Sequence, residues 1–317
     1  MAIFNRDKKA SKEPLDALAP QGARELARTE RSLTVGKLEE ALLKDFPAQD
    51  AEEWDRTGLL VGERDLPLAG VAIALDATVP AIAEAAAAGA NVLLTHHPAF
   101  LDAPSSFAPE KSVALSPGAG VWAAIQHKVA LMDFHTALDV SPVASRVLPA
   151  MLGFKPQGKV MVPAGAGAGA AGAEPGAAVK GKGYGQLCKV PAGPDGPETV
   201  AHIAARCTSV QGRAPRVWGA FDAEVRTAVC ATGSAGNVVD ACVAAGVDCL
   251  VCGEVRYHQA LDASLAGLAI IELGHDVSEL PLCAVLAEAC VRAGVDKGSI
   301  IMLDQGQNWA YPEAIRL

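Results

Sequence analysis

Short apolar segments alternate with segments of helical periodicity along most of the chain. Residues 71–78 have the pattern of a strand, residues 80–90 that of a helix, and residues 91–98 that of a second strand ending in polar residues. Near the start, Thr34 can cap an amphipathic helix whose leucines share one face. Strands that alternate with helices predict an α/β fold of mostly parallel sheets and crossover helices.

The same pattern occurs a second time. Residues 227–234, 237–247 and 248–255 again give strand, helix and strand, and Gly246 aligns with Gly89 at the end of the helix. A repeat at this level predicts two related α/β halves.

The two halves also carry matching polar pairs. His135 is followed four positions later by Asp139, and His275 four positions later by Glu279, each pair directly after a predicted strand. One such pair could arise by chance, but two in register indicate a duplication. We therefore expect the equivalent loops to face one cleft.

Composition divides the chain into four segments. Residues 1–33 are polar and uneven and are interpreted as a tail, and residues 34–162 form the first half. Residues 163–182 are rich in Ala and Gly and predict a flexible connection, after which residues 183–317 form the second half.

Charge and hydropathy exclude several classes of partner. The 317 residues carry a net charge of −9, and no stripe of Lys and Arg of the kind that contacts nucleic acid is present. No apolar run reaches the length of a membrane span, and the charged start lacks the apolar segment of a signal peptide. A cytoplasmic location is therefore predicted, with neither nucleic acid nor membrane as a partner.

The eight cysteines are scattered through apolar segments. Cys249 and Cys252 form a single CxxC, without a second CxxC or a helix start of thioredoxin type. We interpret all eight as reduced residues of the core.

Candidate metal donors follow the predicted strands, where ligands of open parallel sheets collect. The histidines in such positions are His96, His97, His135 and His275. Imidazole and carboxylate suit divalent Zn, Fe, Mn, Co or Ni. Adjacent residues of a strand point to opposite sides, so His96 and His97 are expected to reach two different ions.

Carboxylates complete this candidate site. Glu279 lies one helical turn beyond His275, so it could bind the same ion or bridge two, and Asp139 is the corresponding donor of the other half. Two neighbouring ions would generate a nucleophile from water at neutral pH and act as a Lewis-acid clamp. A single histidine at a strand end is more commonly structural, but the whole set favours a metal site.

Other polar residues leave alternatives open. Glu254 ends a predicted strand and could contact the metal site or a substrate, and His258 is either an entrance residue or a surface residue. His127 and His202 lie on ordinary helix patterns and are interpreted as structural. The glycine-rich turn at residues 232–236 could bind an anion through backbone N–H groups or could simply be a tight turn.

Several motifs together resemble a known family. They are Trp54-Asp55-x-x-Gly58-Leu59-x-x-Gly62, Leu75-Asp76-Ala77-Thr78, Thr95-His96-His97-Pro98, His135-x-x-x-Asp139, Gly233-Ser234, Gly253-Glu254 and His275-x-x-x-Glu279. In this order they resemble the NIF-three-like family, whose members are also called GTP cyclohydrolase 1 type 2 homologues or dinuclear metal-centre hexameric proteins. The resemblance covers roughly residues 34–317.

The resemblance implies two intertwined α/β halves that assemble as a homohexamer. It also implies two divalent metal ions per chain, bridged by Glu279. By position, the implied ligands are His96, His97, Asp139, His275 and Glu279. His135 would lie near the ions, and His135 and Glu254 are the candidates for catalytic proton transfer.

The activity implied is metal-dependent hydrolysis of cyclohydrolase type, with a metal-bound hydroxide attacking a small, nucleotide-like substrate. The alternative is a metal-handling or regulatory protein without turnover of its own. Two departures from the family pattern concern the substrate. Gln186 stands where the family's glycine-rich turn has an arginine, and Arg56 replaces the asparagine of its Trp-Asp-Asn element.

Overall fold

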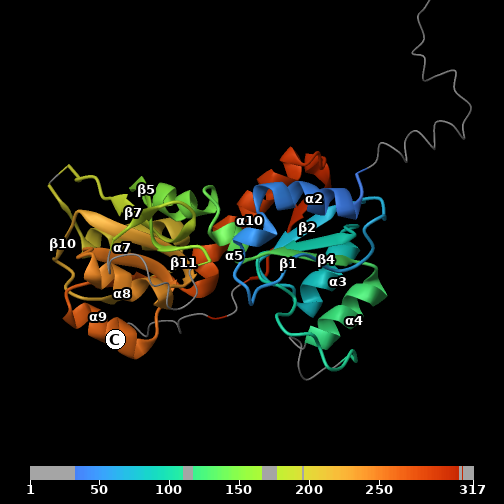
Figure 1. Ribbon diagram of the computed structural model, residues 1–317, viewed down its shortest axis with the longest axis horizontal. Helices are drawn as coiled ribbons and strands as arrows, with labels where there is room; N and C mark the ends of the chain where they lie inside the picture. The colour runs from blue at the N-terminus through green and yellow to red at the C-terminus, as the bar shows by residue number, and fades with distance from the viewer. Residues whose placement is uncertain (1–32, 110–116, 166–176, 195, 307–308, 310–317) are drawn as a thin grey trace, which may run out of the picture.

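The computed structural model describes residues 33–109, 117–165, 177–194, 196–306 and 309. Within them the chain forms two lobes, each built around a β-sheet flanked by helices (Figure 1). The mixed α/β fold expected from the alternating pattern is confirmed. Nearly all of the predicted tail and most of the Ala/Gly-rich connection lie outside the described residues.

The first lobe contains a sheet of five strands. In spatial order they are β1 (Thr57–Val61), β4 (Ala130–Phe134), β3 (Val92–Thr95), β2 (Val71–Ala74) and β14 (Ile300–Met302). Only the pairing of β1 with β4 is antiparallel. Helices α2 (Val35–Asp45) and α10 (His275–Arg292) pack on one face, and α3 (Val79–Ala87) and α4 (Pro117–His127) pack on the other.

The second lobe contains a sheet of seven strands. In spatial order they are β6 (Val179–Lys180), β5 (Lys155–Pro163), β7 (Gly183–Lys189), β11 (Thr227–Ser234), β12 (Cys249–Glu254), β13 (Ala269–Glu272) and β9 (Arg216–Trp218). Only β11, β12 and β13 are mutually parallel. The second sheet contains more antiparallel strands than the sequence predicted. An apolar pattern indicates a strand but not its direction, because the direction depends on the connections.

Helices cover both faces of the second sheet. Helices α6 (Val147–Met151) and α7 (Val200–Gln211) pack on one face. Helices α8 (Gly236–Ala244) and α9 (Tyr257–Leu265) pack on the other. A short pair, β8 (Glu198–Thr199) with β10 (Glu224–Val225), lies beside this sheet.

The sequence repeat is visible in both sheets. Strands β2, β3 and β4 are consecutive and parallel with an antiparallel strand at the edge, and β11, β12 and β13 have the same arrangement beside β9. A helix follows each of the first two strands of either set, and the third strand leads to α5 (Thr136–Asp139) in one lobe and α10 in the other.

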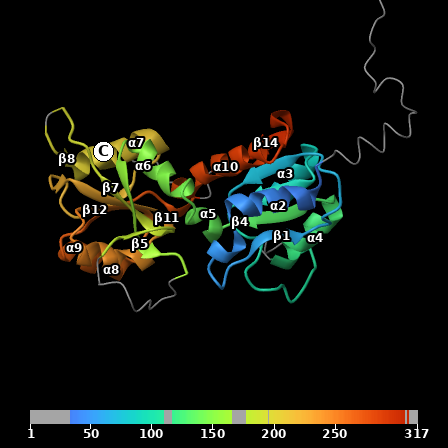
Figure 2. The same ribbon diagram turned by 45° about the horizontal axis from the view of Figure 1, so that its top comes forward.

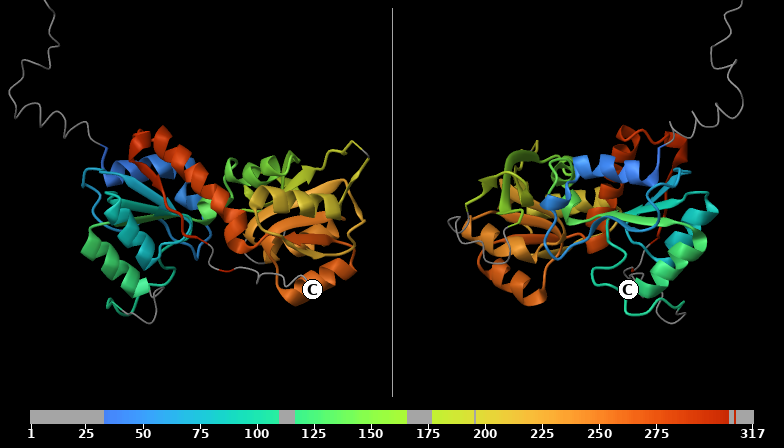
Figure 3. Two further views of the ribbon diagram at one scale, coloured as in Figure 1. Left: turned by 180° about the vertical axis from the view of Figure 1, so that it is seen from behind. Right: turned by 45° about the vertical axis from the view of Figure 1, so that its right-hand side comes forward.

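Each lobe also contains a segment from the other half of the sequence. Strand β5 lies before the Ala/Gly-rich connection yet pairs with β7 in the second sheet, whereas β14 pairs with β2 in the first. Helix α10 runs from the second lobe into the first (Figures 2 and 3). Its start contacts β11 and β12, and its later turns pack against α2 and β2.

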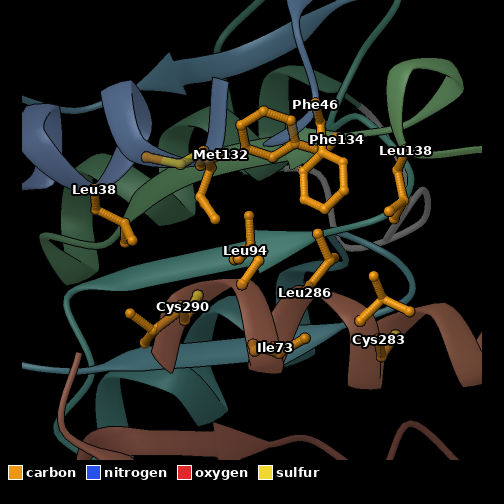
Figure 4. Close-up of a cluster of buried hydrophobic side chains, with 14 of the residues drawn as sticks. Leu38, Phe46, Ile73, Leu94, Met132, Phe134, Leu138, Cys283, Leu286 and Cys290 are labelled. Carbon is orange, nitrogen blue, oxygen red and sulfur yellow. The ribbon is translucent and has the colours of Figure 1, made fainter. Parts of the chain in front are cut away.

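The core of the first lobe fixes α10 in place (Figure 4). Leu286 lies fully buried among side chains from α2 and from the central strands, including Leu38, Ile73 and Leu94. Phe46, just after α2, packs against Phe134 with ring centroids 5.6 Å apart. Because α10 begins with His275 and carries Glu279, this packing also positions two candidate donors.

Local predictions at helix starts and cysteines are confirmed. The Thr34 hydroxyl accepts a hydrogen bond from the N–H of Lys37 at 3.2 Å and caps α2. All eight cysteines are free and buried. Cys249 and Cys252 belong to the cores on opposite faces of β12, so they cannot act together on one ion. None of the described helices has the length and apolar character that a membrane crossing needs.

Candidate metal centre

The predicted donors meet where the two lobes join, close to α5 and the start of α10 in Figure 1. His96 and His97 follow β3, Asp139 ends α5, and His275 and Glu279 lie on consecutive turns of α10. All five residues belong to groups of side chains whose donor atoms lie close enough to hold a metal ion. Sequence elements far apart along the chain therefore converge on one place.

The first group of donors consists of His96, Asp139 and Glu279. The Nε2 atom of His96 is 3.6 Å from Oδ1 of Asp139 and 3.6 Å from Oε1 of Glu279. His96 is fully buried, and Glu279 is 3% exposed. These distances are too long for direct hydrogen bonds, but they leave room for an ion between the three atoms.

The second group consists of His97, His275 and Glu279. Oε2 of Glu279 is 2.9 Å from Nε2 of His97 and 3.2 Å from Nε2 of His275. The two Nε2 atoms are themselves 3.3 Å apart. Three donor atoms thus face one point, and Glu279 offers one oxygen to each group.

Two buried atoms of this cluster lack a hydrogen-bond partner among the described residues. They are Nε2 of His96 and Oε2 of Glu279, the latter lying close to imidazole nitrogens without hydrogen-bond geometry. Burying such atoms unsatisfied is costly. A divalent cation would satisfy both, so the donor set fits a metal.

Each of the four clustered histidines has its other ring nitrogen engaged. Nδ1 of His96 lies 3.2 Å from the carbonyl oxygen of Phe134. Nδ1 of His97 lies 2.8 Å from Oδ1 of Asp76. The partner of His275 is Glu254 at 3.1 Å, and that of His135 is Asp55 at 3.0 Å. Such partners fix the ring so that Nε2 faces the centre, as is usual around protein metal sites.

The electrostatics of the cluster favour positive charge at its centre. Burial opposes the charged form of His97, but the hydrogen bond to Asp76 and the nearby carboxylate of Glu279 outweigh it and raise its pKa to about 10. The Glu279 carboxylate, 3.2 Å from its Nε2, raises the pKa of His275 to about 9. Burial likewise opposes charge on Glu279, yet the surrounding histidines hold its pKa well below the usual range. Burial raises the pKa of Asp139.

Two glycines permit the close packing around Glu279. Gly233 has a φ of +59°, and a Cβ atom there would lie 2.1 Å from Oε1 of Glu279. A Cβ atom on Gly253 would lie 2.3 Å from the carbonyl oxygen of Gly233. A side chain at Gly233 would push Glu279 and α10 away from the end of β11, and one at Gly253 would push β12 away from β11. The N–H of Gly233 also donates to Ser278 Oγ at 2.9 Å. The turn at residues 232–236 therefore packs against the first turns of α10.

His135 lies beside the cluster and forms a third group with His96 and His97. Its ring centroid is 5.3 Å from that of His96 and 5.6 Å from that of His97. On its outer side, the exposed indole of Trp54 packs edge-on, at 5.8 Å between centroids. Asp55, which orients His135, also accepts a hydrogen bond from the N–H of Thr136 at 2.9 Å.

The adjacent histidines differ from expectation in one respect. His96 and His97 were expected to point to opposite sides of a strand, but their ring centroids are only 5.0 Å apart and both face the centre. Strand β3 ends at Thr95, so the alternation of a pleated strand does not extend to the pair. The two rings nevertheless belong to different donor groups, which share Glu279.

The remaining polar candidates lie farther out. Glu254 is exposed and contacts the centre through His275. His258 is exposed on α9 against Tyr257, and His127 and His202 are also exposed. Sequence reasoning assigned no role to Asp55 and Asp76, which orient two of the histidines.

A small pocket of about 30 Å³ adjoins Asp139. Its lining includes hydroxyl and amide side chains, among them Tyr184, Thr232 and Asn237. Gln186, which replaces the expected arginine, also lines it, but its amide donates to the carbonyl oxygens of Lys159 and Leu187 at 2.8 and 3.0 Å. The amide of Gln186 thus stabilises the β5–β7 pairing.

Fold and site together define a class: an α/β protein with two related sheets and a histidine–carboxylate cluster that could hold metal where the lobes meet. The sequence profile of the Duf34/NIF3 (NGG1p interacting factor 3) family matches residues 33–304. The chain belongs to this family, as the motif resemblance indicated.

Individual relatives agree with this assignment. A GTP cyclohydrolase 1 type 2 homolog of Streptomyces coelicolor is 30% identical over 260 residues, covering 79% of this chain and 85% of the relative. Among solved structures, a Staphylococcus aureus hypothetical protein has a TM-score of 0.72 at 21% identity, covering 89% of this chain and 100% of its own. A Bacillus cereus protein related to NIF3 has a TM-score of 0.72 at 20% identity, covering 88% and 98%. At these identities the structures support the fold alone.

Proposed function

We propose that this protein is a dinuclear metal-dependent hydrolase. The observation that carries the proposal is the position of Glu279, whose two carboxylate oxygens face two separate groups of donors. His96 and Asp139 would hold one divalent ion, and His97 and His275 the other, with Glu279 between them. Nitrogen and oxygen donors of this kind accept Zn, Fe, Mn, Co or Ni.

Bound ions would supply Lewis-acid chemistry, activating water and polarising an electrophile. The residues of the chain have complementary roles. Asp76 and Glu254 orient His97 and His275 through their Nδ1 atoms. His135 belongs to a donor group with His96 and His97, so it is our candidate for moving a proton at the substrate, with Asp55 holding the ring. Glu254, which is exposed at the edge of the donor cluster, is the second candidate for this proton transfer.

We further propose a small, nucleotide-like substrate. This part rests on the relatives named as GTP cyclohydrolase 1 type 2 homologs. The polar pocket beside Asp139 would receive a hydroxyl, carbonyl or amide group of such a molecule.

Metal content tests the centre directly. Gently purified protein is expected to hold up to two transition-metal ions per chain by elemental analysis. Glu279→Ala should lose both, because it removes a donor from each group. Glu288→Ala, an exposed residue of the same helix, is the matched control and should retain them. Full metal content in Glu279→Ala would refute the assignment.

Turnover separates a hydrolase from a metal-handling or regulatory protein. Metal-loaded protein is incubated with GTP and a panel of nucleotides and phosphoesters, beside Asp139→Ala. Metal-dependent product formation that the variant loses supports the hydrolase. Ready transfer of ions to a chelator, without turnover on any substrate, would instead support metal handling.

The homohexamer is likewise a proposal, which rests on the family resemblance. Light scattering coupled to size-exclusion chromatography is expected to give six times the 32.5 kDa chain mass. A monomeric mass across the accessible concentration range would contradict it.

A further inference from the structure

Beyond β14, residues 303–306 and Trp309 contact the outer side of the metal centre at two points. We call residues 303–306 together with Trp309 the C-terminal strap. Its first residue continues the sheet, since the N–H of Leu303 donates to the carbonyl oxygen of Ile73 at 2.9 Å. Gln305 then contacts the first lobe and Trp309 the second.

The side-chain amide of Gln305 hydrogen-bonds to the backbone just beyond β2, much as a peptide group of a neighbouring strand would. Its Oε1 accepts hydrogen bonds from the N–H groups of Leu75 and Asp76, both at 2.9 Å. Its Nε2 donates to the carbonyl oxygen of Asp76, also at 2.9 Å. Three hydrogen bonds from one side chain therefore fix the backbone that carries Asp76.

That backbone determines where His97 points. Oδ1 of Asp76 lies 2.8 Å from Nδ1 of His97, and the N–H of His97 donates to the carbonyl oxygen of Leu75 at 2.9 Å. Movement of residues 75–76 would rotate this imidazole away from Glu279.

Trp309 contacts the residues on either side of the other histidine, His275. Its indole stands over the guanidinium of Arg213, 4.1 Å from Cζ to the ring centroid, and its Nε1 donates to Oδ1 of Asp276 at 3.3 Å. Arg213 also donates to Asp276, at 2.9 Å. The ring packs so closely on Gly274 that a Cβ atom there would lie 2.9 Å from it. Asp276 and Gly274 flank His275.

We infer that Gln305 and Trp309 are positioning residues of the metal centre, Gln305 behind the loop of His97 and Trp309 behind the loop that leads into His275. The two loops come from different lobes, yet they bring their Nε2 atoms within 3.3 Å of one another. The strap contacts both loops on their outer sides. This inference rests on the metal centre proposed above and adds that the centre needs the contacts made by Gln305 and Trp309.

The test is Zn²⁺ affinity, measured by competition with a chromophoric chelator on purified full-length protein. Gln305→Ala is expected to weaken binding about 10- to 100-fold, the usual loss when a residue behind a metal ligand is removed. Gln126→Ala, an exposed glutamine of α4, is the matched control and should bind as wild type does. Gln305→Glu keeps an acceptor oxygen, so it should bind Zn²⁺ more tightly than Gln305→Ala does but less tightly than wild type does.

Trp309 is tested in the same way. Trp309→Ala should weaken Zn²⁺ binding, and Trp309→Phe, which retains an aromatic ring over Arg213, should weaken it less. The absorption spectrum of the Co²⁺-loaded protein should also change in Gln305→Ala, because the coordination geometry at His97 changes. A purely structural role would leave that spectrum unchanged in the folded protein.

The outcomes are distinguishable. If wild-type protein binds no Zn²⁺, the proposed metal centre fails and this inference with it. If wild type binds Zn²⁺ and folded Gln305→Ala binds equally well with the same Co²⁺ spectrum, the inference alone is overturned. Should Gln305→Ala not fold, Trp309→Ala decides the question: Zn²⁺ binding and a Co²⁺ spectrum equal to those of wild type would overturn the inference.

Discussion

At the scale of single residues, the candidate site is built from histidines whose two ring nitrogens have different roles. Each clustered histidine has its Nδ1 atom held by an oxygen, which leaves Nε2 for the centre. The oxygens come from a backbone carbonyl in one case and from carboxylates in the others. The rings are thus oriented before any ion arrives, which lowers the cost of binding one.

Asp76→Ala is expected to weaken Zn²⁺ binding about 10- to 100-fold, because His97 loses the partner that orients its ring. Chelator competition measures the change. Asp65→Ala, an exposed residue on the loop before β2, is the control and should behave as wild type. Equal affinities for Asp76→Ala and Asp65→Ala would show that His97 does not need this carboxylate.

Asp133 offers a second prediction at this scale. It is 1% exposed, and neither carboxylate oxygen has a hydrogen-bond partner among the described residues. Burial, reinforced by nearby Asp55, raises its pKa well above the usual range. Because the folded-state pKa exceeds the unfolded one, the free energy of unfolding falls as pH rises above the ordinary aspartate range.

Asp133→Asn cannot ionise and so should escape this loss. At pH 8 in the presence of a chelator, the variant is expected to exceed wild type in free energy of unfolding by about 1 kcal/mol or more. At pH 4 the gap should close. Urea denaturation at both values measures it, and a gap independent of pH would contradict the explanation.

At the scale of elements, Glu272 joins the edge strand β9 to the centre of the second sheet. Its carboxylate accepts hydrogen bonds from Trp218 Nε1 at 2.7 Å and from the N–H of Val255 at 2.8 Å, and it also pairs with Arg216. Burial alone would raise the pKa of Glu272, but the bonds from Arg216, Trp218 and Val255 outweigh it and lower the pKa. The Glu272 side chain thereby connects its own strand β13 to β9 and to the residue that follows β12.

Glu272→Gln is expected to lower the free energy of unfolding at pH 7 by about 1–3 kcal/mol, because it removes a charged acceptor. The folded-state pKa lies below the unfolded one, so the stabilisation is fully present above the ordinary glutamate pKa and is lost as pH falls below it through the folded-state pKa. The difference from wild type should therefore shrink towards pH 3 in thermal or chemical denaturation. A difference that stays constant with pH would exclude a role for the charge.

At the scale of the whole molecule, α10 joins the two lobes and carries two of the five candidate donors, His275 and Glu279. Its first turns lie at the site, and its later turns lie in the core of the first lobe (Figures 2 and 4). Strands β5 and β14 also cross between the halves. The two lobes therefore share elements and are not independent units of the sequence.

Leu286→Ala is expected to lower the free energy of unfolding by about 2–5 kcal/mol, because it opens a cavity where α10 packs on the first sheet. Leu265→Ala makes the same change at a side chain that is 79% exposed and should alter stability by less than about 0.5 kcal/mol. Denaturant titration compares the two variants. Similar small changes in both would mean that α10 does not depend on this core.

Much of the fold followed from the sequence because local patterns encode it. Apolar periodicity predicted the alternating strands and helices, and two His-x-x-x-acid pairs in register indicated the duplication that both sheets display. A sequence pattern reports which face of an element is buried. It says little about strand direction, so the antiparallel flanks of the second sheet were underestimated.

By itself, the sequence determined which donor types follow the strands and that they come in two matching sets, since a residue's place on its own element is a local property. Only the tertiary structure decided which atoms meet. It turned His96 and His97 towards one centre, gave Asp55 and Asp76 their imidazole partners, and brought Gln305 to the backbone of residues 75–76. Contacts such as the last join residues more than two hundred positions apart, and their geometry depends on the packing of whole elements, which no local pattern contains.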